Sequence, residues 1–214
     1  MGTTKIDRTK VAETALRLLN ETGLDGLTLR AIARELDVKA PALYWHFKNK
    51  QELLDEMATA MYRRMLVEET ADLVGRSWRE RIVASQTALR TALLRYRDGA
   101  KVFGGARFTG VDHAPGMEEH LRVMVDAGFD LRQAARAAAT VNAYTMGFVT
   151  EEQGVQPMPG ERRDGYDVSE RAARMADFPL VAASGAELFT GYDELFAEGL
   201  AILVAGIGAR YGVE

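Results

Sequence analysis

Apolar side chains recur every three or four residues along most of the chain, which is the spacing of one face of an α-helix. Leu53, Met57 and Met61 form one such stripe. No segment alternates apolar and polar residues as a half-buried strand does, so the expected fold class is all-α. The pattern predicts helices over about residues 7–23, 28–36, 40–46, 49–65, 77–96, 117–127, 130–151 and 193–211, with a glycine-rich segment at 99–110 and a loop at 154–167.

Signals for helix ends divide the first part of the chain into three short helices. Asp7 or Thr9 caps the first helix, and Gly23 ends it. Thr28 is an N-cap residue for the second helix, and Asp37–Lys39 forms the turn that follows. Three helices with a turn of about three to four residues before the last make a helix-turn-helix, a unit that places its last helix in the major groove of DNA.

A long helix follows and begins with the capping-box sequence Asn49–Glu52. We therefore expect two domains, a helix-turn-helix domain over residues 1–50 and a helical body over residues 51–214. The first has nine Lys and Arg against six Asp and Glu, and the second has 18 against 25. A basic head on an acidic body is typical of a nucleic-acid-binding domain joined to a sensing or assembly domain. The alternative is a random scatter of charge.

The third helix and its end carry a high density of aromatic, imidazole and ammonium groups. Leu43 and Phe47 lie four residues apart and are expected in the core. The residues expected at DNA phosphates are Thr28, Tyr44, His46, Lys48 and Lys50. The residues expected at base edges are Arg30, Lys39, Ala40, Pro41, Ala42 and Tyr44. The alternative interpretation places Tyr44 and Trp45 in the core and the lysines on an ordinary solvated face.

Several classes of function lack the residues that they need. The chain has no cysteine, which excludes disulfides, thiolate metal sites and cysteine nucleophiles. No apolar run is long enough to span a bilayer and the polar start does not resemble a signal peptide, so we expect a cytoplasmic protein without a membrane partner. His113 and His120 lie seven residues apart, which is weak evidence for a metal site. No serine or glycine loop has a catalytic context, and we expect neither an enzyme nor a cofactor or resident metal.

Leu43–Lys50 closely resembles the DNA-binding head of the tetracycline-repressor (TetR) family. The resemblance continues in Tyr96–Val102 and in Tyr144–Gln153, which are similar to the regulatory domain of the family's type member. It implies a transcriptional repressor that binds a palindromic operator in double-stranded DNA as a homodimer. It also implies that a small-molecule inducer releases the repressor from the operator.

The same resemblance assigns residues 51–214 to ligand binding and dimerisation. It implies that the last helix and the helix after Asp130 pair with their copies in a second subunit. Small residues line one side of the last helix and permit close approach of a neighbouring helix, namely Ala197, Ala201, Ala205 and Ala209. The resemblance also adds Trp45 to the residues expected at DNA phosphates.

Departures from the type member concern both DNA and ligand. Ala40 and Ala42 stand where the type member reads bases with a glutamine and a threonine, and methyl groups form no hydrogen bond. A different operator is therefore expected. Phe103 stands where the type member has a histidine that coordinates the Mg²⁺ of its drug complex. A phenyl ring cannot ligate a metal and Glu151 alone is no Mg²⁺ site, so tetracycline–Mg²⁺ is not the expected inducer.

The other residues at the family's inducer site are mainly apolar, so the expected inducer is a flat, largely apolar aromatic molecule such as a polyketide antibiotic. The residues expected to contact it are Leu66, Ser85, Gln86, Leu89, Phe103, Arg107, Phe108, Met117, Asn142, Tyr144, Phe148 and Glu151. The family suggests that the regulated gene serves efflux or biosynthesis. The alternative is a DNA-binding regulator without an inducer, acting as an activator or a constitutive repressor.

Overall fold

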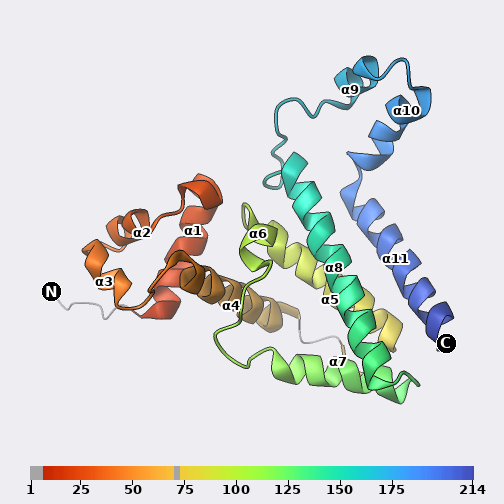
Figure 1. The fold of residues 1–214 in the computed structure, drawn as a ribbon, viewed down its shortest axis with the longest axis horizontal. Coiled ribbons are helices and arrows are strands. Elements are labelled where there is room, and N and C mark those ends of the chain that lie inside the picture. Colours follow the sequence, from red (N-terminus) through yellow and green to blue (C-terminus); the bar gives the residue numbers. More distant parts are fainter. Residues whose placement is uncertain (1–6, 70–72) are drawn as a thin grey trace. The chain divides into compact units, whose positions relative to one another are not determined.

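The computed structural model describes residues 7–69 and 73–214, and every regular element in these ranges is a helix, which confirms the all-α prediction (Figure 1). In chain order the helices are α1 (Arg8–Gly26), α2 (Leu29–Glu35), α3 (Ala40–Tyr44), α4 (Lys50–Glu69), α5 (Trp78–Leu94), α6 (Gly99–Phe103), α7 (Ala114–Asp126), α8 (Leu131–Val155), α9 (Val168–Arg174), α10 (Pro179–Leu188) and α11 (Tyr192–Tyr211). None of the helices within the described ranges is both long and apolar enough to cross a membrane.

The chain divides into two compact units. The first comprises Met1–Thr70 and Ala92–Ala114, and the second comprises Ala71–Thr91 and Pro115–Glu214. The first unit includes α4, whereas the domain boundary at residue 50 stays a prediction from sequence.

The first unit is built around α1 and α4, which pack against each other. The carboxylate of Asp7 caps α1, as one of the two predicted alternatives has it. Gly23 has a φ of 67° and kinks the helix where its end is predicted, and the chain then continues helically to Gly26. Glycine adopts this left-handed conformation without steric cost. The kink is held because the carboxylate of Asp98 accepts a hydrogen bond from the backbone N–H of Leu24 at 3.0 Å.

The helix α4 packs against both α1 and α6. The side-chain oxygen of Asn49 accepts a hydrogen bond from the backbone N–H of Glu52 at 2.9 Å, so the predicted cap is present. Leu53, Met57 and Met61 are all buried, as the apolar stripe predicts. Because α4 packs against both α1 and α6, its charged side chains contact residues that are distant in the sequence.

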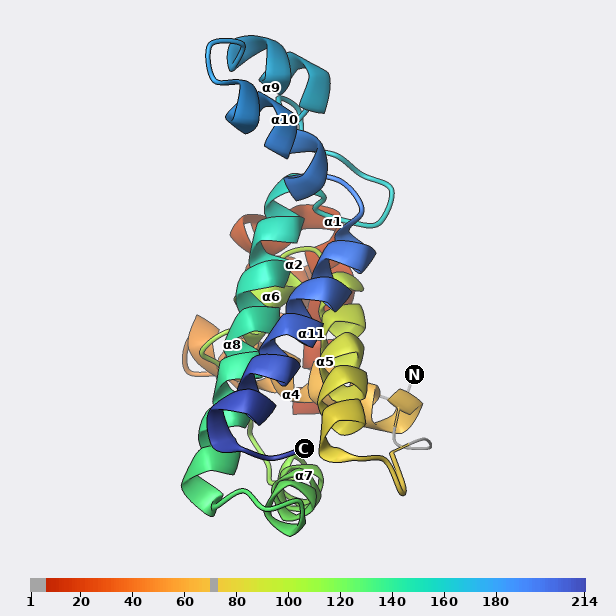
Figure 2. The same cartoon turned by 90° about the vertical axis from the view of Figure 1, so that its right-hand side faces the viewer.

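In the second unit α8 and α11 pack side by side (Figure 2). A capping box starts α8, in which the side chains of Asp130 and Gln133 each accept a hydrogen bond from the other's backbone N–H. The core between the helices contains Trp78, Ile82, Met124, Phe129, Val141, Phe196, Leu200 and Val204. The helices α9 and α10 pack mainly on each other.

Three helices have no counterpart in the prediction, namely α6, α9 and α10. The helix α6 lies in the glycine-rich segment, where glycine lowers helix propensity. No residue of α9 is buried, and Gly185 is the one buried residue of α10. Hydrophobic periodicity reports burial, so helices that bury almost nothing leave no such pattern. The helix α8 also continues to Val155, beyond its predicted end at residue 151.

Candidate nucleic-acid interface and ligand-contact residues

The helix-turn-helix of the first unit is formed by α2, a tight turn and α3. The Thr28 hydroxyl accepts a hydrogen bond from the backbone N–H of Ala31 at 3.1 Å and caps α2 as predicted. Asp37 takes a φ of 53° in the turn, a left-handed conformation that aspartate tolerates better than most residues. Leu43 and Phe47 are fully buried, so the end of α3 is anchored to the core as predicted.

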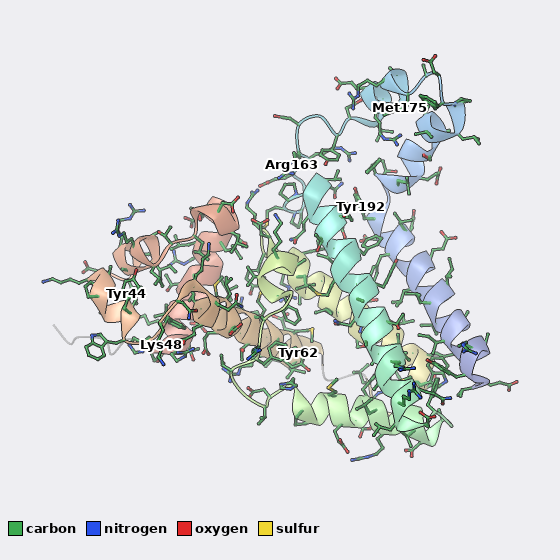
Figure 3. The ribbon with its side chains drawn as sticks, in the orientation of Figure 1. Tyr44, Lys48, Tyr62, Arg163, Met175 and Tyr192 are labelled. Carbon is green, nitrogen blue, oxygen red and sulfur yellow. The ribbon has the colours of Figure 1, made fainter. Side chains whose placement is uncertain are left out.

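The rings beside these anchors point away from the core. Trp45 is 90% exposed and Tyr44 is 55% exposed, so the interpretation that places both in the core is wrong. Figure 3 labels Tyr44 and Lys48 at this end of the first unit. Thr28, Arg30, Lys39, Pro41, Lys48 and Lys50 are also exposed, while Ala40, Ala42 and His46 are half-buried. The residues predicted to meet DNA therefore include a large exposed ring with two ammonium groups close to it in sequence.

One of these ammonium groups has a second role in the fold. The Lys50 Nζ donates a hydrogen bond to the backbone carbonyl of Leu24, near the end of α1, at 2.9 Å. An ammonium group has three protons, so two remain for another acceptor. The contact holds the Lys50 side chain in a defined position.

In the first unit, predicted ligand-contact residues belong to an aromatic cluster. The rings of Phe103 and Phe108 pack edge to face with centroids 5.5 Å apart. Phe108 also lies 4.9 Å from the ring of Tyr62 and 5.1 Å from the ring of His113. Burial raises the pKa of the Tyr62 hydroxyl. Neither Tyr62 nor His113 is among the predicted ligand contacts. The helical spacing of residues on α4 could have indicated Tyr62 as a further contact.

The polar edge of this cluster is also defined. His113 Nδ1 is buried and has no hydrogen-bond partner among the described residues. The Arg107 side chain is exposed, and its backbone N–H donates to the carboxylate of Asp55 at 3.0 Å. Leu66 is half-buried at the far end of α4.

In the second unit, the predicted contacts on α5 have partners within the unit. The Ser85 hydroxyl donates to the carbonyl of Ile82 at 3.2 Å, and the Gln86 side-chain oxygen accepts a hydrogen bond from Thr145 at 2.8 Å. Leu89 is buried.

Two predicted contacts on α8 pack against α11. Tyr144 stacks on Phe196 with centroids 5.5 Å apart and donates its hydroxyl proton to the Phe196 carbonyl at 3.0 Å. Gly199 leaves the space for this hydroxyl, because a Cβ there would collide with it. Phe148 lies 5.2 Å from the same Phe196 ring. Both rings thus contribute to the core of the second unit, and their contact with a ligand stays a prediction, as it does for the exposed residues Met117, Asn142 and Glu151.

The position expected to hold a metal ligand carries a phenyl ring, which cannot coordinate Mg²⁺. Phe103 fills the position of the metal-binding histidine and packs against another phenyl ring. Within the described ranges, no group of three or more His, Cys, Asp or Glu side chains is arranged to hold a metal ion.

Comparisons with known proteins agree with this architecture. Residues 11–57 match the family model described as bacterial regulatory proteins, tetR family, and residues 72–211 match the model of the tetracyclin repressor-like C-terminal domain. The chain is 40% identical over 211 residues to the tetracycline repressor protein class A from transposon 1721 of Escherichia coli, covering 97% of this chain and 93% of that protein.

Solved structures extend the likeness to the whole fold. A possible TetR family transcriptional regulator from Streptomyces coelicolor A3(2) superposes with a TM-score of 0.82 and 36% identity, covering 95% of this chain and 100% of that one. A TetR variant from Acinetobacter baumannii AYE, in complex with minocycline, superposes with a TM-score of 0.72 and 33% identity, covering 97% and 99%. The chain therefore belongs to the tetracycline-repressor family of DNA-binding transcriptional regulators, with an N-terminal helix-turn-helix domain and a C-terminal ligand-binding domain.

Proposed function

We propose that the protein is a homodimeric repressor that binds a palindromic operator through α3 and leaves it when a flat, largely apolar aromatic molecule binds. Trp45 carries the DNA part of this proposal, because it is 90% exposed next to Tyr44 and close in sequence to Lys48. A large exposed ring beside cations indicates a surface that a binding partner such as DNA covers.

The roles within this surface follow from side-chain chemistry. Trp45, His46, Lys48 and Lys50 contact the phosphate backbone, together with Thr28. Base reading falls to Arg30, Lys39 and Tyr44, with methyl contacts from Ala40 and Ala42 and ring contact from Pro41. Arginine and lysine donate to guanine and the methyl groups suit thymine, so the operator differs from one that glutamine and threonine read.

A homodimer supplies two such surfaces for the two halves of the operator. The small residues of α11 named above are all exposed in the single chain, and Ile202 beside them is 66% exposed. Pairing of α8 and α11 with their copies covers this face. The protein works in the cytoplasm without catalytic activity, and its target gene serves efflux or biosynthesis.

The aromatic cluster supports an inducer that needs no metal. Phe103, Phe108 and Tyr62 offer ring faces and edges, and the half-buried His113 offers a nitrogen with no protein partner among the described residues. Such a set suits a polycyclic aromatic molecule with a few oxygens. The relative in complex with minocycline supports the same size and shape of ligand.

The DNA role is tested with duplexes that the wild-type chain enriches from a randomised library. Lys50→Ala should weaken binding to all duplexes alike and lower the slope of log Kd against log salt by about one, because one phosphate contact is lost. Lys101→Ala, a matched exposed lysine on α6, should leave the slope unchanged. An unchanged slope with Lys50→Ala, or a loss confined to one duplex, contradicts the phosphate role.

The ligand role is tested by thermal shift with a panel of polycyclic aromatic antibiotics, each with Mg²⁺ and with a chelator. A true inducer at about 100 times its Kd stabilises the folded state by about 2.7 kcal/mol and releases the operator, with or without the chelator. Phe103→His gains Mg²⁺-dependent binding of tetracycline only if the remaining contacts are tetracycline-like. If the chelator abolishes ligand binding by the wild type, the metal-free proposal is contradicted. If no compound in the panel raises the melting temperature, the alternative of a regulator without an inducer is favoured.

A further inference from the structure

A carboxylate is buried on α4, at the centre of the first unit. The Glu56 side chain is only 7% exposed and lies near two arginines, each facing a different carboxylate oxygen. Arg8 Nε donates to Glu56 Oε2 at 2.9 Å, whereas Arg63 Nη1 lies 3.9 Å from Glu56 Oε1. Glu56 therefore has one tight and one loose partner.

The tight partner holds the end of the recognition helix. Arg8 also donates to the backbone carbonyl of His46, and its guanidinium carbon lies 4.4 Å from the centre of the Phe47 ring. Both residues directly follow the exposed Trp45. Arg8 thus connects Glu56 of α4 to the residues that directly follow α3.

The loose partner is held by the loop after α6. Arg63 Nε and Nη2 both donate to Asp112 Oδ2, at 3.0 and 2.7 Å. The hydrogen bond from Arg63 lowers the pKa of the Asp112 carboxyl. Gly110 allows this close approach, because a Cβ there would lie 2.7 Å from Asp112 Oδ2 and 3.1 Å from Arg63 Nη2. Asp112 thereby draws the Arg63 side chain away from Glu56.

The same loop carries a predicted ligand contact. Phe108 stands between Arg107 and Thr109 in the sequence. The backbone N–H of Thr109 donates a hydrogen bond to the Thr59 hydroxyl of α4 at 2.9 Å. The Phe108 ring packs against Tyr62 and His113. The segment that holds Asp112 is therefore continuous with the predicted ligand contact Phe108.

Arg63 has room to change partners. A hollow of about 660 Å³ that is open to solvent lies next to the network, and Arg8, His46, Glu56, Arg63 and Thr109 line it together with Asp7 and Thr9. Because Arg63 Nη1 already lies 3.9 Å from Glu56 Oε1, a short movement of the guanidinium brings it onto Glu56. A cation that approaches Glu56 competes with Arg8 for the same two oxygens.

We propose that Arg63 exchanges between Asp112 and Glu56, and that this exchange transmits the position of the loop to the recognition helix. With Asp112 in place, Arg63 is occupied and Glu56 holds Arg8. When Asp112 withdraws, Arg63 binds Glu56, Arg8 loses its partner, and the residues that follow α3 lose their connection to α4. The inference rests on the proposed function in one respect, that the end of α3 contacts DNA.

The test uses the full chain and the duplex that the wild type enriches from a randomised library, with Kd measured by fluorescence anisotropy. Asp112→Asn should weaken binding by about tenfold, within the usual range of allosteric coupling. Loss of a negative charge by itself strengthens binding to a polyanion, so a weaker complex isolates the exchange. Gly110→Ala should act in the same direction, because it forces Arg63 and Asp112 apart.

The decisive variant removes the exchanging group. Arg63→Gln should bind within about twofold of wild type, and Asp112→Asn in the Arg63→Gln background should cause no further loss, since no cation is released onto Glu56. Glu118→Gln is the matched control, because it removes an exposed carboxylate from a surface pair with Arg122 and should leave the Kd unchanged. A loss that persists in the double variant overturns the proposal, as does an Asp112→Asn variant that binds like wild type.

Two readouts separate this inference from the proposed function. Trp45→Ala should abolish binding in every background if α3 contacts DNA. Suppose that the wild type and the Asp112→Asn variant bind DNA equally well and the Trp45→Ala variant does not bind. This result would refute the exchange and leave the proposed DNA-binding function intact. Hydrogen exchange needs no DNA: the backbone amides of His46 and Phe47 should exchange faster in Asp112→Asn than in wild type or in the double variant, and equal rates refute the exchange.

Discussion

Two arginines of this protein meet carboxylates in opposite ways. Arg90 in the second unit donates through Nε and Nη2 to the two oxygens of Glu152, at 2.8 and 2.7 Å, and both side chains are less than 10% exposed. Arg63 in the first unit is 42% exposed and directs two donors to a single oxygen of Asp112, which is 44% exposed. The first pair is matched in shape and almost closed to water, although Arg90 Nη1 also donates to the exposed Asp193 at 2.7 Å. The second pair is open to water, and its second carboxylate, Glu56, is 3.9 Å from Arg63.

The difference teaches where a fold is rigid and where it can switch. Removing Glu152 would leave the buried Arg90 charge with only one exposed partner, so the pair is expected to persist through motions that leave the fold intact. A half-exposed arginine can be solvated during an exchange and loses little on changing partners. Arg90 thus stabilises the second unit, whereas Arg63 can change its ion-pair partner when its surroundings change.

The largest effect is expected from breaking the closed pair. Glu152→Ala leaves Arg90 with only the highly exposed Asp193 as a partner and should lower the free energy of unfolding by about 3–5 kcal/mol. Urea denaturation monitored by circular dichroism measures this. Glu151→Ala, which truncates the exposed neighbour, should stay within about 0.5 kcal/mol of wild type. Equal losses of unfolding free energy in the two variants would show that the Arg90–Glu152 pair contributes no more to stability than an exposed carboxylate does.

A smaller loss is expected at the buried end of the open network. Glu56→Gln should cost about 1 kcal/mol in the same assay, because Arg8 and Arg63 remain accessible to water and the amide still accepts a hydrogen bond. Glu152→Gln should cost more, since Arg90 has no access to water. The reverse order would contradict the distinction between the two networks.

The burial of His120 should make stability depend on pH. Arg81 is 3.9 Å from Glu119, and burial, with a smaller contribution from the charge of Arg81, lowers the pKa of His120 below its ordinary 6.5. The unfolded chain then takes up the His120 proton at a higher pH than the folded chain does. His120 therefore adds no penalty well above pH 6.5, and it destabilises the fold increasingly as the pH falls from 6.5 through the lowered pKa.

Unfolding by urea at about pH 7.5 and about pH 5.5 measures this dependence, because the two values lie on either side of the ordinary histidine pKa. Wild type should lose more stability than His120→Gln on acidification. Parallel losses in the two proteins would mean that His120 is protonated in the folded state as easily as in the unfolded chain.

The smallest effect is expected at an isolated surface pair. Arg122 approaches Glu118 at 3.4 Å and Glu119 at 3.5 Å, and all three side chains are well exposed. Glu118→Gln should change the free energy of unfolding by less than about 0.5 kcal/mol, because exposed pairs contribute little. A loss above 1 kcal/mol would mean that exposure is a poor guide to the strength of ion pairs in this protein.

The local signals in the sequence predicted the helices that position the interface. Thr28 and Asn49 cap helices as expected, because a short polar side chain satisfies the free N–H groups of the first turn wherever the helix lies. Leu43 and Phe47 are buried as their four-residue spacing predicts. The spacing could not decide between an exposed and a packed Trp45, since tryptophan occurs in both settings.

The amino-acid order alone thus accounts for the all-α class, the helix-turn-helix and the aromatic and basic groups at its end, because these depend on neighbours within about one or two helical turns. The tertiary structure decided which charges share a partner. Arg8 and Glu56 are 48 residues apart, and Arg63 and Asp112 are 49 residues apart. Such pairs form only when packing brings α4 against α1 and against the loop after α6, and no local pattern records that approach.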